Sequence, residues 1–505
     1  MGWARPLPVI VVELSRSAMS AELSDVAQGL ASSEAVSGSG ESGAEQFGAL
    51  LPDTRRALFR RLAVGQAEGR APSMTGAVVR GGQVAWTGAR DSSASDGIGG
   101  VDVQYRIGSI TKTFVAVLVM RLRDEGLLTL EDRLGDHLSD SPGPDVTIAQ
   151  LLSHSSGLAA EARGPWWERT PGSLRQTSGD LFGENPRRLP AGRRFHYSNP
   201  AYALLGSLVE QKRGGQAWDE VLRCEVLEPL GMTRTSLLAE APHADGWAVH
   251  PWADVLLPEP AEDTGLMGPA GQLWSTVEDL GRWAVFLTHG DDRVLGAATL
   301  AEMRTPAVPP EGAEWDAGFG LGIQLARRNG RLLFGHSGSM PGFQSALWID
   351  AAEAVAGIAL TNCTSGPAVS AIAADLAGIV ADREPRIPEA WRPLAGPLDE
   401  GLLALTGPWY WGAHPYVLRL RADRGLEISL MSGPGGRASR FRAESDGTWT
   451  GLDGYFAGET LRVVRDEDDG SVSHLDLGTF VFTRGPYAPA GPVPGGVDAE
   501  GWRGR

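Results

Sequence analysis

Two short alternating apolar runs predict a β-hairpin in the first quarter of the chain. The runs cover residues 76–80 and 83–87, and the dipeptide Gly81-Gly82 separates them. Two glycines between alternating runs supply the positive φ angles that a tight hairpin turn requires. The hairpin is therefore expected to form one edge of a sheet.

Helical periodicity indicates two helices on either side of this hairpin. The first is expected over about 52–66, with Asp53 or Thr54 as its cap. The second is expected to open at Ser109 and to end at Gly126, with an apolar stripe formed by Phe114, Val117, Leu118 and Leu122.

Strand-like patterns return in the middle of the chain, after a long stretch of helices and loops from about 147 to 278. Short apolar runs at 332–334, 344–349 and 354–360 precede a predicted helix at 367–381. Strands at both ends of a region with helices between them imply one sheet built from both ends, with a helical insertion.

A composition change near residue 385 predicts further organisation. The stretch 385–397 is rich in proline, and beyond it short alternating runs separated by glycines suggest a small antiparallel barrel. The predicted divisions are a disordered arm at 1–44, a main domain at 45–384, a linker at 385–405, a barrel at 406–485 and a disordered tail at 486–505.

Charge narrows the classes of partner. The chain has 505 residues and a formal net charge of -17, which disfavours nucleic acid and anionic membrane surfaces. No apolar run approaches the roughly 20 residues of a spanning helix. We predict no signal peptide at the N-terminus and expect a cytoplasmic protein.

The two cysteines, Cys224 and Cys363, are expected to be reduced and buried.

The tetrapeptide Ser109-Ile-Thr-Lys112 could carry nucleophilic chemistry. Residues three apart on a helix share a face, so the serine hydroxyl and the lysine amine can meet. Serine needs a nearby base, and a desolvated lysine can have its pKa lowered enough to act as one. The chain has only two lysines, Lys112 and Lys212. A charged residue within so apolar a helix is therefore unexpected unless it has a function.

Two further segments carry polar groups beside structured elements. Tyr197-Ser-Asn199 precedes Pro200, which fits the first turn of a helix, and offers a phenol and a carboxamide on one side of an extended loop. His336-Ser-Gly338-Ser339 is expected at the end of a short strand, where His336 could hydrogen-bond the Tyr/Ser network. A core tyrosine beside a helix cap and an ordinary turn are the simpler interpretations of these two segments.

Taken in order, these three motifs resemble the serine β-lactamase and penicillin-binding-protein superfamily, in particular its class C-like esterase and D-peptidase branch. Supporting segments are Arg106-Ile-Gly-Ser109, Leu151-Leu-Ser-His-Ser-Ser-Gly-Leu158, Pro229-Leu-Gly-Met232 and Gly335-His-Ser-Gly-Ser339. The resemblance covers about 50–384. It implies an α/β fold with a β-lactamase-like antiparallel sheet flanked by helices, an all-helical subdomain, and a small all-β antiparallel barrel that resembles a lipocalin-like appendage.

The resemblance also implies roles for the site residues. Ser109 would attack a carbonyl, and Lys112 and Tyr197 would share the proton transfers. Backbone N–H groups of Ser109 and Ser339 would form the oxyanion hole. The substrate, a small molecule or a peptide, would be held by Asn199, His336, Gly338 and Ser339.

One departure from the family pattern matters for substrates. Many relatives carry lysine where this chain has His336, so a fixed cation for a substrate carboxylate is missing. We therefore favour a serine hydrolase of esters, amides or D-amino-acid peptides. Acyl transfer, including peptide cyclisation by a thioesterase, β-lactam hydrolysis and a non-catalytic ligand-binding or scaffold role are the alternatives. No cofactor or metal is expected, because the histidines are scattered and the only dinucleotide-like glycine pattern lacks a flanking strand.

Overall fold

The computed structural model describes residues 49–92, 100–183, 185–308, 316–385, 390–432, 437–466 and 468–487. The predicted arm at 1–44 and nearly all of the predicted tail at 486–505 lie outside these residues. The chain divides into two compact units, residues 1–385 and 386–505. Each is described by itself.

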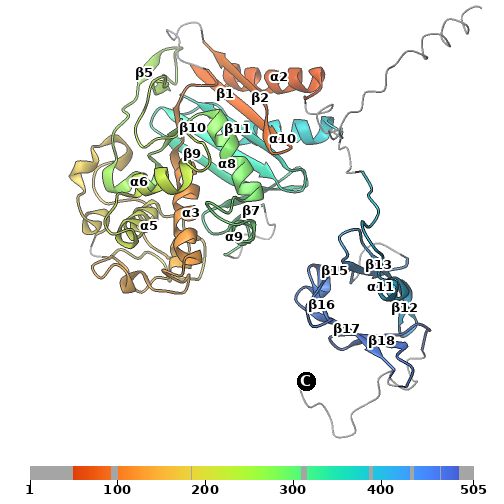
Figure 1. Ribbon diagram of the computed structural model, residues 1–505. Helices are drawn as coiled ribbons and strands as arrows, with labels where there is room; N and C mark the ends of the chain where they lie inside the picture. Colours follow the sequence, from red (N-terminus) through yellow and green to blue (C-terminus); the bar gives the residue numbers. More distant parts are fainter. Residues whose placement is uncertain are drawn as a thin grey trace, which may run out of the picture. The chain divides into compact units, whose positions relative to one another are not determined.

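The first unit is built on a seven-stranded antiparallel sheet (Figure 1). Its strands, in spatial order, are β2 (Gln83–Asp91), β1 (Ser73–Arg80), β11 (Val355–Thr361), β10 (Phe343–Asp350), β9 (Arg331–Met340), β8 (Gln324–Arg328) and β7 (Ala317–Phe319). The pairing of β1 with β11 confirms that the two ends of the unit build one sheet. Gly81 and Gly82 have φ angles of +60° and +76°, and they form the predicted hairpin turn.

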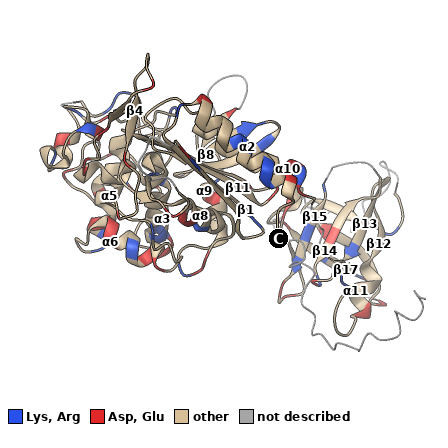
Figure 2. Ribbon diagram, turned by 90° about the horizontal axis from the view of Figure 1, so that it is seen from above, with Lys and Arg blue, Asp and Glu red and all other residues tan. Residues whose placement is uncertain are grey.

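Helices cover both faces of this sheet. On one face lie α2 (Pro52–Glu68) and α10 (Val369–Arg383), and on the other lies α8 (Val277–His289) (Figure 1). The central strands β10 and β11 are buried along almost their whole length. This explains why their sequences read as nearly continuous apolar runs. Figure 2 shows acidic and basic residues side by side on α2 and α10, which face solvent on their outer sides.

The insertion between β2 and β7 supplies the helical half of the first unit. Besides α8, its α-helices in the described residues are α3 (Thr111–Asp124), α4 (Ile148–Leu152), α5 (Asn199–Lys212), α6 (Trp218–Leu222), α7 (Gly268–Gly271) and α9 (Ala297–Met303). Two short ladders also occur here: β3 (Tyr105–Arg106) with β6 (Trp274–Ser275), and β4 (Trp247–Val249) with β5 (Leu256–Pro258). The apolar face of α3 is the centre of the main core.

The second unit is an eight-stranded antiparallel barrel preceded by α11 (Glu400–Leu405). The strands follow chain order: β12 (Gly407–Trp411), β13 (His414–Leu420), β14 (Leu426–Leu430), β15 (Ser439–Ala443), β16 (Trp449–Gly451), β17 (Thr460–Arg465), β18 (Val472–Leu477) and β19 (Phe480–Phe482). Reciprocal backbone hydrogen bonds between Tyr410 and Thr483 join the first strand to the end of the last. Large apolar side chains fill the interior. The predicted small antiparallel barrel is confirmed.

Several local expectations were wrong. Neither Asp53 nor Thr54 caps α2: Leu51 is the N-cap and Pro52 begins the helix, because proline needs no N–H partner there. Ser109 lies in a single 3₁₀ turn, η2 (Gly108–Ile110), and the α-helix starts only at Thr111. Cys224 is exposed, whereas Cys363 is buried, and both are free. None of the helices in the described part of the chain is long and apolar enough to cross a bilayer.

Candidate active site

Ser109 is held in the η2 turn between β3 and α3, against strand β9. Gly108, just before it, has a φ of +51° and lies against Ser339: a Cβ on Gly108 would come within 2.5 Å of the Ser339 backbone nitrogen. Only glycine fits both the backbone conformation and this approach. The turn therefore brings the Ser109 hydroxyl to the edge of the sheet.

Lys112 lies one turn further on, and its side chain is completely buried. Its ammonium nitrogen donates to Ser109 Oγ at 2.9 Å, Asn199 Oδ1 at 2.8 Å and the Ala270 carbonyl at 2.5 Å. Burial lowers the pKa of Lys112 to about 7, against the opposing attraction of Glu161 and Glu168. The structure thus brings the predicted serine and lysine together, with the lysine able to be neutral near pH 7.

Tyr197 stands on the other side of this pair, just before α5. Ser198 caps that helix through a hydrogen bond from Ala201 N, and Pro200 occupies its first turn as predicted. The Tyr197 ring lies 4.9 Å from Lys112 Nζ. Burial raises the pKa of the phenol strongly, and a hydrogen bond with Ser109 opposes that rise. Tyr197 is therefore a neutral phenol in contact with both residues of the pair.

The Asn199 side chain already has partners on both of its polar atoms. Its oxygen accepts from Lys112, and its Nδ2 donates to Glu161 Oε1 at 2.9 Å. The predicted hold on a substrate amide stays a prediction, because the carboxamide links Lys112 to Glu161 in this structure. Glu161 was not singled out from the sequence, since a lone glutamate in a loop has no distinguishing pattern.

His336 does not form the predicted hydrogen bond with the Tyr/Ser network. Strand β9 continues to Met340, so His336 lies within the strand rather than at its end. Its Nδ1 contacts the Ser337 carbonyl at 2.5 Å, and its Nε2 has no hydrogen-bond partner among the described residues. Burial, with the nearby Lys112, lowers the pKa of His336 to about 3. The imidazole is therefore neutral at physiological pH.

Gly338 and Ser339 lie where β9 meets the η2 turn. A Cβ on Gly338 would come within 2.1 Å of the Ile107 carbonyl oxygen and 2.8 Å of the Ser109 backbone nitrogen. Gly338 is thus required for the contact between strand and turn. The close packing places the backbone nitrogens of Ser109 and Ser339 on the two sides of this contact, which suits the predicted oxyanion hole.

His154 is a further site residue whose role the sequence did not reveal. It is fully buried, and its Nδ1 accepts a hydrogen bond from Ser198 N at 3.1 Å. Its ring centroid lies 4.1 Å from that of Tyr197. It also has a φ of +55°, an uncommon backbone conformation for a non-glycine residue. The motif from Leu151 to Leu158 pointed to the family, but only the fold places its histidine under Tyr197.

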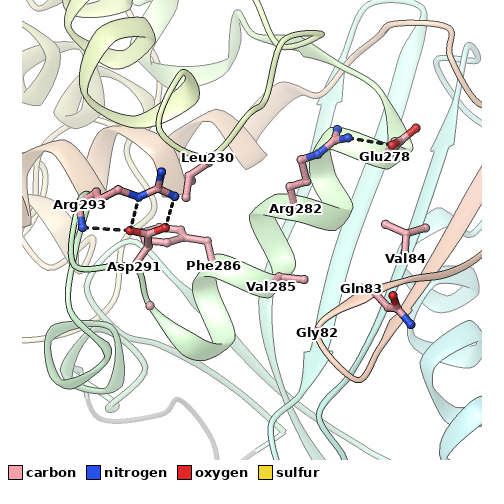
Figure 3. Close-up of a pocket in the computed structure, with 11 residues that line it drawn as sticks. Gly82, Gln83, Val84, Leu230, Glu278, Arg282, Val285, Phe286, Asp291 and Arg293 are labelled. Carbon is pink, nitrogen blue, oxygen red and sulfur yellow. Dashed lines mark hydrogen bonds and ion pairs between the residues drawn. The ribbon is translucent and has the colours of Figure 1, made fainter. Parts of the chain in front are cut away.

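One surface pocket lies away from these residues, between the β1–β2 turn and α8 (Figure 3). It has a volume of about 510 Å³ and none of the predicted catalytic residues lines it. Its two arginines are already paired, Arg282 with Glu278 and Arg293 with Asp291. This pocket offers no nucleophile next to a base.

A family model described as Beta-lactamase matches residues 56–382. The chain belongs to the β-lactamase family. Penicillin-binding protein 4 of Amycolatopsis lactamdurans is 30% identical over 336 residues, which are 61% of this chain and 84% of that protein. A second family model, a domain of unknown function (DUF7586), matches residues 398–484, which include the barrel.

Similar solved structures have the same fold. A D-stereospecific amidohydrolase from Streptomyces sp. has a TM-score of 0.52 and 24% identity, covering 62% of this chain and 95% of its own. An octameric penicillin-binding protein homologue from Pyrococcus abyssi has a TM-score of 0.55 and 20% identity, covering 85% of this chain and 99% of its own. Membership of the β-lactamase family supports, in general terms, a serine hydrolase that works through an acyl-enzyme.

Proposed function

We propose that this β-lactamase family member is a serine hydrolase that forms an acyl-enzyme on Ser109, acting on an amide, an ester or a D-amino-acid peptide. One observation carries the proposal: a completely buried Lys112 amine lies 2.9 Å from Ser109 Oγ. A base must lie within hydrogen-bond reach of the proton that it takes, and its pKa is best near the working pH. Lys112 meets both conditions.

The proposed reaction has two halves. Neutral Lys112 takes the Ser109 proton while Oγ attacks the substrate carbonyl carbon, and the Ser109 and Ser339 N–H groups stabilise the oxyanion. Tyr197, which contacts both Ser109 and Lys112, passes the proton to the leaving amine or alcohol. Water then repeats the attack on the acyl-enzyme and releases the carboxylic acid.

The charges around the site favour a substrate with a free amino group. The Glu161 carboxylate accepts from Asn199 Nδ2 and Trp167 Nε1, and Glu168 accepts from Trp166 Nε1. Both carboxylates attract the Lys112 amine, and Glu168 also faces Arg106, but neither forms a salt bridge with a residue that the structure describes. An ammonium group near the scissile carbonyl would pair directly with them. The amidohydrolase relative, named for D-stereospecific action, is consistent with D-aminoacyl amides.

The neutral state of His336 disfavours substrates that need a cation for their carboxylate. Burial keeps the imidazole uncharged at neutral pH, so it cannot pair with a carboxylate. This argues against penicillins as good substrates. A non-catalytic scaffold role is disfavoured because the nucleophile, the base and the phenol lie in mutual contact.

The test is covalent labelling. The protein is treated with a fluorophosphonate probe, and the adduct is located by mass spectrometry. We expect an adduct on Ser109 that is absent from Ser109→Ala. Folded wild-type protein without label on Ser109 would refute the proposal.

A substrate panel then defines the class. We expect D-aminoacyl amides to be cleaved faster than their N-acetylated forms, because acetylation removes the substrate's ammonium charge. This preference should shrink in Glu161→Gln, because that substitution removes the carboxylate proposed to pair with the ammonium. p-Nitrophenyl esters, nitrocefin and peptidyl thioesters are compared in parallel. If added amine acceptors are consumed in preference to water, the enzyme is an acyltransferase and hydrolysis is not its function.

A further inference from the structure

Residues 262–275, which we call the strap, run beside the segment that carries Ser109 and Lys112. Strand β6, at the end of the strap, pairs with β3, so that Trp274 faces Arg106. Ile107 N donates to the Leu273 carbonyl at 2.9 Å, and Leu273 N donates to Thr111 Oγ1 at 3.2 Å. The strap also contains Ala270, whose carbonyl accepts from Lys112. It thus forms part of the wall around the lysine.

Arg106 forms hydrogen bonds at two points of the strap, residues 262 and 272. Its Nη2 donates to the Glu262 carbonyl and to Gln272 Oε1, each at 2.7 Å. The same Gln272 oxygen accepts from Thr264 N at 3.2 Å and from Thr264 Oγ1 at 2.7 Å. Arg106, Gln272 and Thr264 are all buried. This buried cluster closes residues 262–272 into a loop, with Ala270 inside it.

Burial of the Arg106 charge is energetically unfavourable at a position with a purely structural role. Arg106 forms no salt bridge with the described residues, although the carboxylates of Glu168, Asp263 and Glu262 attract it from further away. Its Nε and Nη1 have no hydrogen-bond partner among the described residues. Burial lowers the pKa of Arg106 to about 10, so it is still a cation at neutral pH. Burying a charge without a directly paired counter-ion is unfavourable, and an apolar side chain would often pack there at lower cost. Stability therefore does not explain the arginine.

We propose that Arg106 is a positioning residue for Lys112: it holds the strap closed, so that the Ala270 carbonyl meets the amine and water is kept away from it. The proposal rests on the proposed function, in which Lys112 is the base. Opening the strap would admit water to the lysine. Since desolvation is the main cause of its lowered pKa, hydration would raise that pKa.

The groups that face Lys112 from other elements do not depend on Arg106 hydrogen bonds. They are the carboxylates of Glu161 and Glu168, the phenols of Tyr197 and Tyr202, and the imidazoles of His154 and His336. Glu168 alone among them also faces the Arg106 cation. The variant Glu168→Gln, measured beside the arginine variants, separates a charge effect through Glu168 from movement of the strap.

The chain offers a direct measurement, because Lys112 and Lys212 are its only lysines. Full-length protein labelled with ¹³C at the lysine ε-carbon gives two signals, and Lys212→Arg assigns them. We expect Arg106→Met to raise the Lys112 pKa by about one unit or more. The midpoint of the rise in kcat/KM with pH should shift by the same amount as the Lys112 pKa. Activity should therefore fall about tenfold at pH 6.5 and recover at pH 9. A loss of structure alone would lower activity at every pH.

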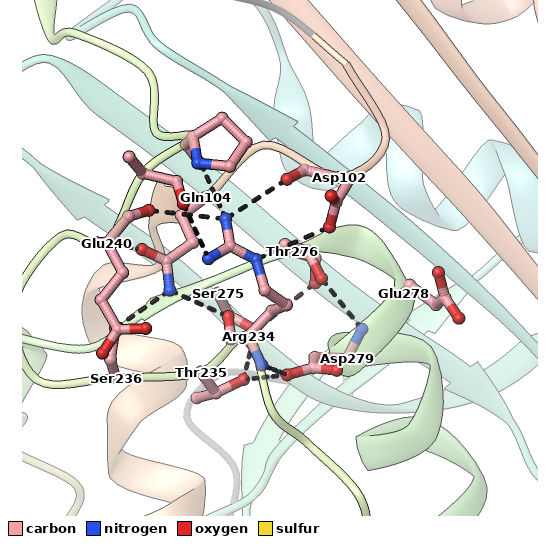
Figure 4. A network of polar contacts seen from close by, with 12 residues as sticks. Asp102, Gln104, Arg234, Thr235, Ser236, Glu240, Ser275, Thr276, Glu278 and Asp279 are labelled. Carbon is pink, nitrogen blue, oxygen red and sulfur yellow. Dashed lines mark hydrogen bonds and ion pairs between the residues drawn. The ribbon is translucent and has the colours of Figure 1, made fainter.

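Arg234→Met is the matched control. Arg234 donates to the backbone carbonyls of Asp102, Glu240, Ala241 and Pro242 (Figure 4), as Arg106 does to that of Glu262. The hydrogen bonds of the Arg234 side chain to described residues do not include one to the loop at 262–272. It should lower stability without moving the Lys112 signal. If Arg106→Met leaves the Lys112 pKa within about 0.2 units of wild type, the proposal is wrong.

Two milder variants keep the test decisive if Arg106→Met does not fold. Gln272→Met removes the shared acceptor and should raise the Lys112 pKa, whereas Arg106→Lys keeps a cation that can still reach one acceptor and should raise it less. An unchanged Lys112 pKa in Gln272→Met would overturn the proposal. The NMR titration needs no substrate, so it stands apart from the labelling of Ser109. Absence of that label would refute the proposed function and not the effect of Arg106 on Lys112.

Discussion

At the scale of single residues, Lys112 combines complete burial with three hydrogen-bond acceptors: the Ser109 hydroxyl, the Asn199 side chain and the Ala270 carbonyl. These partners orient the amine toward Ser109. Burial disfavours its charged form and lowers the pKa to about 7. Below that pH the protonated amine has no lone pair with which to accept the serine proton.

The first prediction is the pH dependence of catalysis. Because Lys112 must lose a proton to act, kcat/KM should rise with pH through a midpoint near the pKa of about 7. Lys112→Ala should lower kcat/KM by roughly 10²- to 10⁴-fold and abolish this limb. Steady-state rates between pH 5 and 9 measure both effects.

Lys212 supplies the control for that experiment. It is the only other lysine and donates to the Leu127 carbonyl at the protein surface. Lys212→Ala should leave the pH profile unchanged. Near-wild-type turnover by Lys112→Ala would show that another group is the base.

The second prediction concerns His154. His154→Leu removes the acceptor of the buried Ser198 N–H and the ring that packs on Tyr197. We expect a loss of roughly 1–3 kcal/mol in stability and a fall in kcat greater than any change in KM. Denaturant unfolding and steady-state kinetics measure these. His154→Asn tolerates the positive φ and keeps an acceptor, so it should restore part of both; no such rescue would exclude the hydrogen bond as the cause.

At the scale of elements, the contact between the η2 turn and strand β9 creates the site. Gly108 and Gly338 allow two backbone segments to approach more closely than any side chain would permit. The Ser109 and Ser339 nitrogens lie on the two sides of this contact. The η2 turn and strand β9, which are distant in sequence, are therefore brought into contact by two glycines.

The third prediction tests this contact. Gly338→Ala should push β9 away from the turn, because its Cβ would meet the Ile107 carbonyl oxygen at 2.1 Å. Removing one oxyanion-hole donor typically costs about 10²- to 10³-fold in kcat, and a loss of that size is expected. Gly330→Ala, in the open turn between β8 and β9, has space for a methyl group and is the control. Its positive φ should cost some stability without lowering kcat.

At the scale of the whole molecule, the two units have separate hydrophobic cores. The hydrophobic cores of the first unit surround its sheet and α3. The hydrophobic core of the barrel is formed by the barrel strands and α11. Contacts within each unit define the division at residues 385 and 386. Each unit therefore buries its own set of apolar side chains.

The fourth prediction follows from these separate cores. Calorimetry of the full chain should show two unfolding transitions. Leu418→Ala, in the barrel core, should lower only one of them, by about 2–5 kcal/mol of unfolding free energy, and leave the labelling of Ser109 unchanged. A single transition that shifts as a whole would contradict independent folding.

The sequence by itself determined those features that depend on local pattern or on short spacing. Period-two runs around Gly81-Gly82 fixed the hairpin, and the barrel strands followed from alternation between glycines. The three-residue spacing from Ser109 to Lys112 already placed the hydroxyl and the amine on one face. Such features involve neighbours in the chain, which is why a single sequence contains enough information to find them.

Only the tertiary structure decided which distant groups surround Lys112 and how far they shift its pKa. Ala270, Asn199 and Glu161 reach the site from three separate segments. The sequence singled out Asn199 but not its link between Lys112 and Glu161, and nothing in the local sequence marks Ala270 or Glu161. The strap held by Arg106 and the burial that neutralises His336 are likewise products of packing. Desolvation depends on every atom that excludes water from a group, so it is a property of the folded chain and not of any motif.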